Sequence, residues 1–294
     1  MTTLSLESAR AKFGWAGYHL NSLRGEVESF EARYDYTISF TRHADAGKYE
    51  FHVRGLQSVP PHWGLLIGDC VHNARCALDH LVSQLASIGL GVPARDICNV
   101  AFPIYTDSKS WKGAVAGQLK DVPPGYRTRI EELQPFNAFD PSIWGYGLGA
   151  TPGLLPMVLG RLDALENTDK HRAVHAVWHR VPFAAYRPYP AFPMGYELAS
   201  GGAVAGALAN DAEIGDWQFK SPLPDDQWRP TPVDMQRHFP VRVCLGDLPS
   251  GQPICDMLGQ LLWAVDRVLE IFGPISQGKA PQAVTAVLPD FPFV

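Results

Sequence analysis

The chain has 294 residues, 46% of them hydrophobic, and a formal net charge of −5. This is enough apolar material for a real core, and the acidic balance argues against a protein that coats nucleic acid electrostatically, although a local basic patch could still guide RNA or another anion. The five cysteines are odd in number and form no Cys-x-x-Cys pair, so neither a disulfide framework nor a zinc ribbon is expected.

The beginning of the chain lacks the charged and then apolar pattern of a signal peptide. No apolar run approaches the roughly 18 residues of a membrane span. We therefore predict a cytoplasmic protein that does not enter a membrane.

The first predicted element is a helix over residues 5 to 32, where apolar residues recur at three- and four-residue spacing. Strict alternation over residues 34–41 and 49–54 then predicts a β-hairpin. Aromatic and basic side chains are mixed in this hairpin, as they are in single-stranded nucleic acid binders. A polar face opposite an apolar one is also what any half-buried antiparallel pair shows, and we favour that interpretation.

The central predicted helix covers residues 62 to 87, follows two prolines and contains none. One face is apolar and is expected in the core. The opposite face carries short or forked groups within an arc of roughly 160° and has no Lys or Glu, which is typical of a site rather than of a solvated surface. These groups are Asp69, His72, Asn73, Arg75, Cys76, Asp79 and His80. A buried hydrogen-bonded network that fixes helix packing would use the same residue types, and this alternative stays open.

The rest of the chain predicts four further helices and four further strands. Short helices are expected near residues 111–119 and 126–133, and longer helices over residues 154–167 and 253–272. Alternating segments between the two long helices predict strands that could form an antiparallel sheet. These segments are residues 174–181, 195–200, 213–220 and 240–245.

A second polar cluster, Asp169-Lys-His-Arg172, follows the helix that is predicted to end near Asn167. Cations at a helix C-terminus interact favourably with the helix dipole, which would explain Lys170 and Arg172 without any further function. It does not explain Asp169 beside His171, a carboxylate and an imidazole that could reach the central helix.

The predicted fold class is α+β, a helical bundle with an N-terminal β-hairpin and an antiparallel sheet from the C-terminal half. We expect a single domain over residues 1–294. Its helical core would be formed by residues 5–172 with 253–272, and its β-rich part by residues 173–250.

Within the central helix, Arg75-Cys-Ala-Leu-Asp-His80 resembles the R-x4-6-H signature of HEPN-superfamily ribonucleases. In that family the motif lies on a late helix of a helical bundle, and paired motifs from two subunits cleave RNA without metal. The resemblance implies a HEPN-like bundle in which His80 is a general acid or base toward the ribose 2′-hydroxyl or the leaving oxygen. It also implies that Arg75 stabilises the phosphorane charge.

A wider resemblance covers both polar clusters. The segments Gly68-Asp-Cys-Val-His-Asn-Ala-Arg-Cys-Ala-Leu-Asp-His80 and Leu165-Glu-Asn-Thr-Asp-Lys-His-Arg172 are similar to paired motifs in a group of uncharacterised bacterial proteins. This second resemblance implies no activity.

The function we expect is a HEPN-like, metal-independent, RNA-cleaving or nucleotide-handling protein of the kind found among bacterial toxins and defence components. It would act as a homodimer and need no cofactor. The expected catalytic residues are Arg75, His80, His72 and Asp79. The expected binding residues are Asp69, Asn73, Asp169, Lys170, His171 and Arg172.

Two other functions stay open. Asp69-x-x-His72 places a carboxylate and an imidazole one helical turn apart, as in bundles that hold iron or manganese, and Asp79, His80, Asp169 or His171 could complete such a metal site. A non-catalytic protein could instead bind a small molecule or a partner on the polar helix face, with tryptophans and tyrosines of the loops lining the pocket.

The two clusters are expected to be coupled if the helix that ends near Asn167 packs against the central helix. A buried Arg75 would then need a carboxylate, and Asp79 lies one turn away. We therefore expect that Arg75→Ala and Asp79→Ala lower stability, whereas His80→Ala and His171→Ala mainly change activity or ligand binding.

Overall fold

A computed structural model describes residues 4–33, 36–43, 47–138, 153–171, 176–180, 198–203, 207–221, 241–246 and 252–273. The fold is α+β, as the sequence predicts. Two compact units make up the chain, one formed by residues 1–22, 65–173 and 257–293, and the other by residues 23–64 and 174–256 with the last residue.

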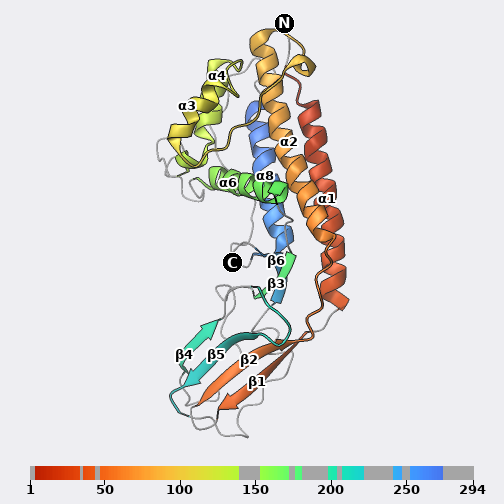
Figure 1. The fold of residues 1–294 in the computed structure, drawn as a ribbon, viewed down its shortest axis with the longest axis vertical. Helices are drawn as coiled ribbons and strands as arrows, with labels where there is room; N and C mark the ends of the chain where they lie inside the picture. The colour runs from red at the N-terminus through yellow and green to blue at the C-terminus, as the bar shows by residue number, and fades with distance from the viewer. Residues whose placement is uncertain are drawn as a thin grey trace. The chain divides into compact units, whose positions relative to one another are not determined.

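The first unit is helical. Its long helices are α1 (Glu7–Arg33), α2 (Trp63–Leu90), α6 (Leu154–His171) and α8 (Ile254–Phe272), of which α1, α2 and α8 each have one end in the second unit. In Figure 1, α1, α2 and α8 run alongside one another and α6 crosses them. Two shorter helices, α3 (Ser108–Ala116) and α4 (Pro124–Glu132), cover one side of this bundle (Figure 1). Two short turns, η2 (Ala94–Asp96) and η3 (Pro135–Asn137), also belong to this unit.

Apolar side chains at helical spacing hold the bundle together, as the periodicity predicts. Many core-facing residues of α2, α6 and α8 have no solvent exposure, so each of these contributes the free energy of a fully buried aliphatic side chain, about 1.5–3 kcal/mol. Examples are Leu78, Leu81, Leu85, Leu159, Leu162, Val265 and Leu269.

Helix α6 is longer than predicted. The structure continues it to His171, whereas Asn167 or Thr168 was expected to stop it. No glycine or proline follows Asn167 to break the helix, and the Lys170 ammonium pairs with the Glu166 carboxylate one turn earlier. Asp169 and Lys170 therefore lie on the last turn of a helix instead of in a connecting loop.

The second unit contains the strands. The predicted hairpin consists of β1 (Thr37–His43) and β2 (Lys48–Arg54), and β2 also pairs antiparallel with β5 (Glu213–Phe219). Strand β4 (Leu198–Ala203) completes a sheet with the order β1-β2-β5-β4. A separate antiparallel pair joins β3 (Ala176–Arg180) to β6 (Val241–Leu245) (Figure 1).

This pairing differs from the prediction that the four later strands form one sheet among themselves. Tyr49, Phe51 and Val53 of β2 are all buried, and the Phe51 ring lies 4.7 Å from the Trp217 ring of β5, centroid to centroid. Cross-strand aromatic contacts of this kind stabilise a sheet and favour the hairpin as the neighbour of β5.

Candidate functional site

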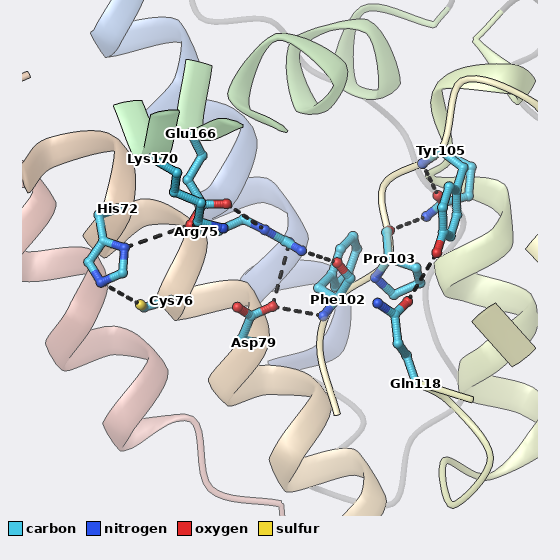
Figure 2. A network of polar contacts seen from close by, with 11 residues as sticks. His72, Arg75, Cys76, Asp79, Phe102, Pro103, Tyr105, Gln118, Glu166 and Lys170 are labelled. Atoms are coloured by element: carbon cyan, nitrogen blue, oxygen red, sulfur yellow. Dashed lines mark hydrogen bonds and ion pairs between the residues drawn. The ribbon is translucent and has the colours of Figure 1, made fainter. Parts of the chain in front are cut away.

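Arg75 lies at the centre of a largely buried polar network in the first unit (Figure 2). Its side chain is only 10% exposed. The Nε atom is 3.4 Å from a carboxylate oxygen of Glu166 on α6, and Nη1 is 3.5 Å from Oδ1 of Asp79 on α2. The third nitrogen, Nη2, donates a hydrogen bond to the carbonyl oxygen of Phe102 at 2.5 Å. The guanidinium is thus engaged by groups of the protein itself.

Asp79 binds the same backbone unit as Arg75. Its Oδ1 accepts a hydrogen bond of 2.8 Å from the backbone N–H of Phe102, so the two side chains together hold both polar groups of that residue. Burial raises the pKa of Asp79, and the Arg75 charge and the Phe102 hydrogen bond oppose this shift. Arg75 and Asp79 therefore position the extended segment that begins at Phe102.

Gln134 holds the continuation of this segment. It is fully buried, its Oε1 accepts a hydrogen bond from the Tyr105 backbone N–H at 3.0 Å, and its Nε2 donates to the carbonyl oxygens of Pro103 and Ile130 at 2.9 and 3.0 Å. The segment from Phe102 to Tyr105 is thus fixed at both ends by side chains, which satisfies backbone groups that no sheet or helix satisfies.

The raised pKa of Asp79 has a measurable consequence. Folded Asp79 keeps its proton to a higher pH than the unfolded carboxyl, whose ordinary pKa is 3.8, so its stabilising contribution is present below that value and is lost as the pH rises through the folded pKa. Raising the pH from about 4 to about 7 should therefore destabilise the wild type more than Asp79→Asn, measured as unfolding free energy by urea titration at each pH.

Asp107 is the control for this measurement, because hydrogen bonds from Ser110 lower its pKa at the N-cap of α3. Its contribution is present above 3.8 and is lost as the pH falls through the lowered folded pKa, so Asp107→Asn should keep most of the wild-type pH dependence between about 4 and 7 and differ from the wild type mainly at lower pH. Equal pH dependence of stability in the wild type and Asp79→Asn would contradict a raised pKa for Asp79.

His72 is the most exposed titratable group of this network. Its side chain is 55% exposed, whereas that of Glu166 is only 6% exposed. The His72 Nδ1 atom lies 3.7 Å from Glu166 Oε1, and Nε2 lies 3.4 Å from the sulfur of Cys76 (Figure 2). The Lys170 ammonium, 53% exposed, is 3.1 Å from the same Glu166 oxygen. A buried carboxylate thus links three cationic or protonatable groups, and two of them reach solvent.

Further carboxylates surround this arrangement. The Asp169 side chain approaches α2 so closely that a Cβ atom on Gly68 would lie 2.5 Å from its Oδ1, so a side chain at Gly68 would displace the Asp169 carboxyl. Burial raises the pKa of Asp169, and the neighbouring Asp69 carboxylate raises it further. Asp163 also has a pKa raised by burial and accepts a hydrogen bond from Asn167.

The remaining predicted site residues are placed differently. Asn73 donates to the Asp69 backbone carbonyl and accepts a hydrogen bond from Lys12 of α1 at 3.3 Å, while the Asp69 side chain is exposed. The Nδ1 atom of His80 is buried and has no hydrogen-bond partner in the part of the chain that the structure describes, and no ion pair or hydrogen bond there joins it to Arg75. His171 ends α6, with its side chain outside the described residues, as is all of Arg172.

Three members of the network were missed by sequence reasoning: Glu166, Gln134 and Lys12. Glu166 carries a local signal, because it precedes Lys170 by four residues and Asp169 by three on one helix and so shares their face. Gln134 and Lys12 carry none, since their partners are distant in the sequence.

Among the residues described, no group of three or more His, Cys, Asp or Glu side chains is arranged to hold a metal ion. None of the described helices has the length and apolar character needed to cross a bilayer. Comparison of the chain with protein-family models, with curated proteins and with solved structures finds no match.

Proposed function

We propose that this protein is a metal-independent RNA-cleaving or nucleotide-handling enzyme in which His72 transfers a proton. The observation that carries the proposal is the placement of an exposed imidazole against the buried Glu166 carboxylate, beside the exposed Lys170 ammonium. The carboxylate lies 3.7 Å from the imidazole Nδ1 and 3.1 Å from the Lys170 ammonium, so it gathers both groups at one place on the surface. The nearby cation suits an anionic substrate.

The reaction that fits these groups is transfer of a phosphodiester to the ribose 2′-hydroxyl. His72 takes the 2′-hydroxyl proton, the oxygen attacks phosphorus, and the bond from phosphorus to the 5′-oxygen breaks. The leaving oxygen takes a proton from solvent, and Lys170 pairs with the phosphate oxygens. The products are one strand that ends in a 2′,3′-cyclic phosphate and another that begins with a 5′-hydroxyl.

Arg75 and Asp79 act as positioning residues in this proposal, because Arg75 pairs with Glu166 and both side chains hydrogen-bond the backbone of Phe102. The resemblance of Arg75-Cys-Ala-Leu-Asp-His80 to the HEPN signature also supports RNA as the substrate. It makes His80 the second candidate for proton transfer. From the same resemblance we propose a homodimer that serves as a bacterial toxin or defence component, and the beginning of the sequence leads us to propose a cytoplasmic location.

The test is cleavage of RNA by the purified full-length protein in EDTA. His72→Ala should reduce the rate about 100-fold, the lower end of what a general acid or base contributes. His62→Ala is the matched control, since His62 is also exposed, by 56%, and also pairs with a glutamate, Glu26. His62 should be dispensable because Glu26 is itself 45% exposed and no second cation is paired with it among the described contacts.

The outcomes separate the candidate functions. Loss of activity in His80→Ala but not in His72→Ala would assign the proton-transfer role to His80, the histidine of the HEPN-like motif. No cleavage by the wild type, or equal cleavage by all variants, would overturn the proposal. Activity that appears only after a divalent metal replaces EDTA would favour the metalloenzyme alternative.

A further inference from the structure

Three aromatic side chains form a cluster on α1, in which Trp15 and Tyr18 are exposed and His19 is half-buried. Trp15 and Tyr18 are 57% and 60% exposed, and their ring centroids are 5.3 Å apart with the planes at 81°. The His19 ring lies 6.0 Å from that of Trp15 and 5.7 Å from that of Tyr18. We call these three residues the α1 aromatic cluster. Large rings on a surface lack the free energy that burial would give them, and a cluster of such rings is typical of a binding surface.

The cluster lies beside the proposed site. Lys12 of α1 donates a hydrogen bond to Asn73 of α2, the residue after His72, so the two helices are in contact at this level. Trp15 and His19 follow Lys12 by three and seven residues, which places all of them on the flank of α1 that faces α2. Since α1 and α2 run antiparallel in Figure 1, the cluster lies one to two turns from Asn73 toward the beginning of α2.

The charges around the cluster favour a particular ligand. Lys12, His72 and Lys170 place cationic or protonatable groups at one end of this surface, next to the buried Glu166 carboxylate and the Asp169 carboxyl. At the other end Asp69 is exposed one turn before Asn73, and its carboxylate would repel a phosphate. The aromatic rings suit an uncharged base, and the cations suit the phosphate attached to it. The carboxylate at the other end disfavours a phosphate there.

We propose that the α1 aromatic cluster is a stacking platform for an unpaired nucleobase whose phosphodiester lies at His72 and Lys170. This inference rests on the proposed function and deepens it, because it makes single-stranded RNA the substrate. Every base has an aromatic face, so the platform would bind single strands with little sequence preference.

The test measures binding separately from cleavage. The probe is a fluorescein-labelled single-stranded oligonucleotide with 2′-O-methyl riboses, which cannot be cleaved through the 2′-oxygen, and the readout is fluorescence anisotropy with the full-length protein. Trp15→Leu should raise the Kd roughly 10-fold, within the range found when an aromatic ring that stacks on a base is removed. Trp15→Phe keeps an aromatic face and should remain within about 3-fold of the wild type.

Leu65→Ala is the control, because Leu65 is an exposed apolar residue of α2, 73% exposed, that has no aromatic face. It should leave the Kd unchanged. An unchanged Kd for Trp15→Leu, or no binding by the wild type, would overturn the platform. So would a loss of oligomers in both Trp15→Leu and Leu65→Ala without a change in Kd, because the surface would then contact a second copy of the chain.

Failure of the platform and failure of the proposed function give different results. His72-dependent cleavage with an unchanged Kd for Trp15→Leu overturns only the platform. Binding that depends on Trp15, with no cleavage by any form, overturns the enzyme and supports the platform on a binding protein.

Discussion

Arg75→Ala should lower the free energy of unfolding by about 3–5 kcal/mol, the usual cost of removing one partner from a buried ion pair. Only 10% of the Arg75 side chain and 6% of the Glu166 side chain are exposed, so the remaining carboxylate would stay largely out of water with one counterion fewer. The Phe102 carbonyl would also lose its hydrogen bond. Urea denaturation of both forms at neutral pH measures the difference.

Arg10→Ala is the matched control. Arg10 of α1 forms an ion pair with Asp266 of α8, but its side chain is 41% exposed, so its removal should cost under about 1 kcal/mol. A cycle with Glu166→Ala adds a second criterion, since residues in one network are not additive and the double variant should lose less than the sum of the single variants. Equal losses for Arg75→Ala and Arg10→Ala would mean that water reaches the network and would remove the physical case for a site.

Sequence reasoning identified the polar face of α2 because its evidence is local. A helix without Lys or Glu on one side is visible from residue spacing alone, and so is the pairing of Arg75 with Asp79, which lies one turn away and is confirmed at 3.5 Å. Glu166 approaches Arg75 from α6, and no local pattern specifies which residue of a distant helix will meet a given arginine.

The sheet shows the same limit. Alternation over residues 49–54 correctly predicts a strand, since it reports which side chains point to each face. It does not report which strand lies alongside. The partner of β2 is set by contacts such as that of Phe51 with Trp217, which form only when distant segments have come together.

The role of Arg75 is where the resemblance and the geometry differ most. The signature implies a guanidinium that meets the substrate phosphate, but Phe102, Asp79 and Glu166 engage it inside the protein. The residues with access to solvent are instead His72 and Lys170, which the same buried Glu166 links. The motif thus marks the face of α2 that carries the polar network, and the structure shows which of the network's side chains are exposed to solvent.

Gln134→Ala should lower the free energy of unfolding by about 3–5 kcal/mol, although Gln134 carries no charge and was not expected at the site. Its removal would leave the Tyr105 N–H and the Pro103 carbonyl without their bonds and would open a cavity at a fully buried position. Gln118→Ala is the control, because Gln118 is only half-buried and its hydrogen bond from the Tyr105 hydroxyl is 3.5 Å long. Its loss should cost under about 1 kcal/mol.

Gln134→Leu separates hydrogen bonding from packing, because leucine fills most of the volume and satisfies none of the backbone groups. We expect it to be destabilised nearly as much as Gln134→Ala, since a buried unsatisfied backbone group costs about 1–3 kcal/mol. Amide hydrogen exchange at Tyr105 gives a second measurement, and its protection should fall in Gln134→Leu but not in Gln118→Ala. Wild-type stability in Gln134→Leu would show that the segment from Phe102 to Tyr105 is held by apolar packing, with Arg75 and Asp79 as the side chains that still anchor its backbone at Phe102.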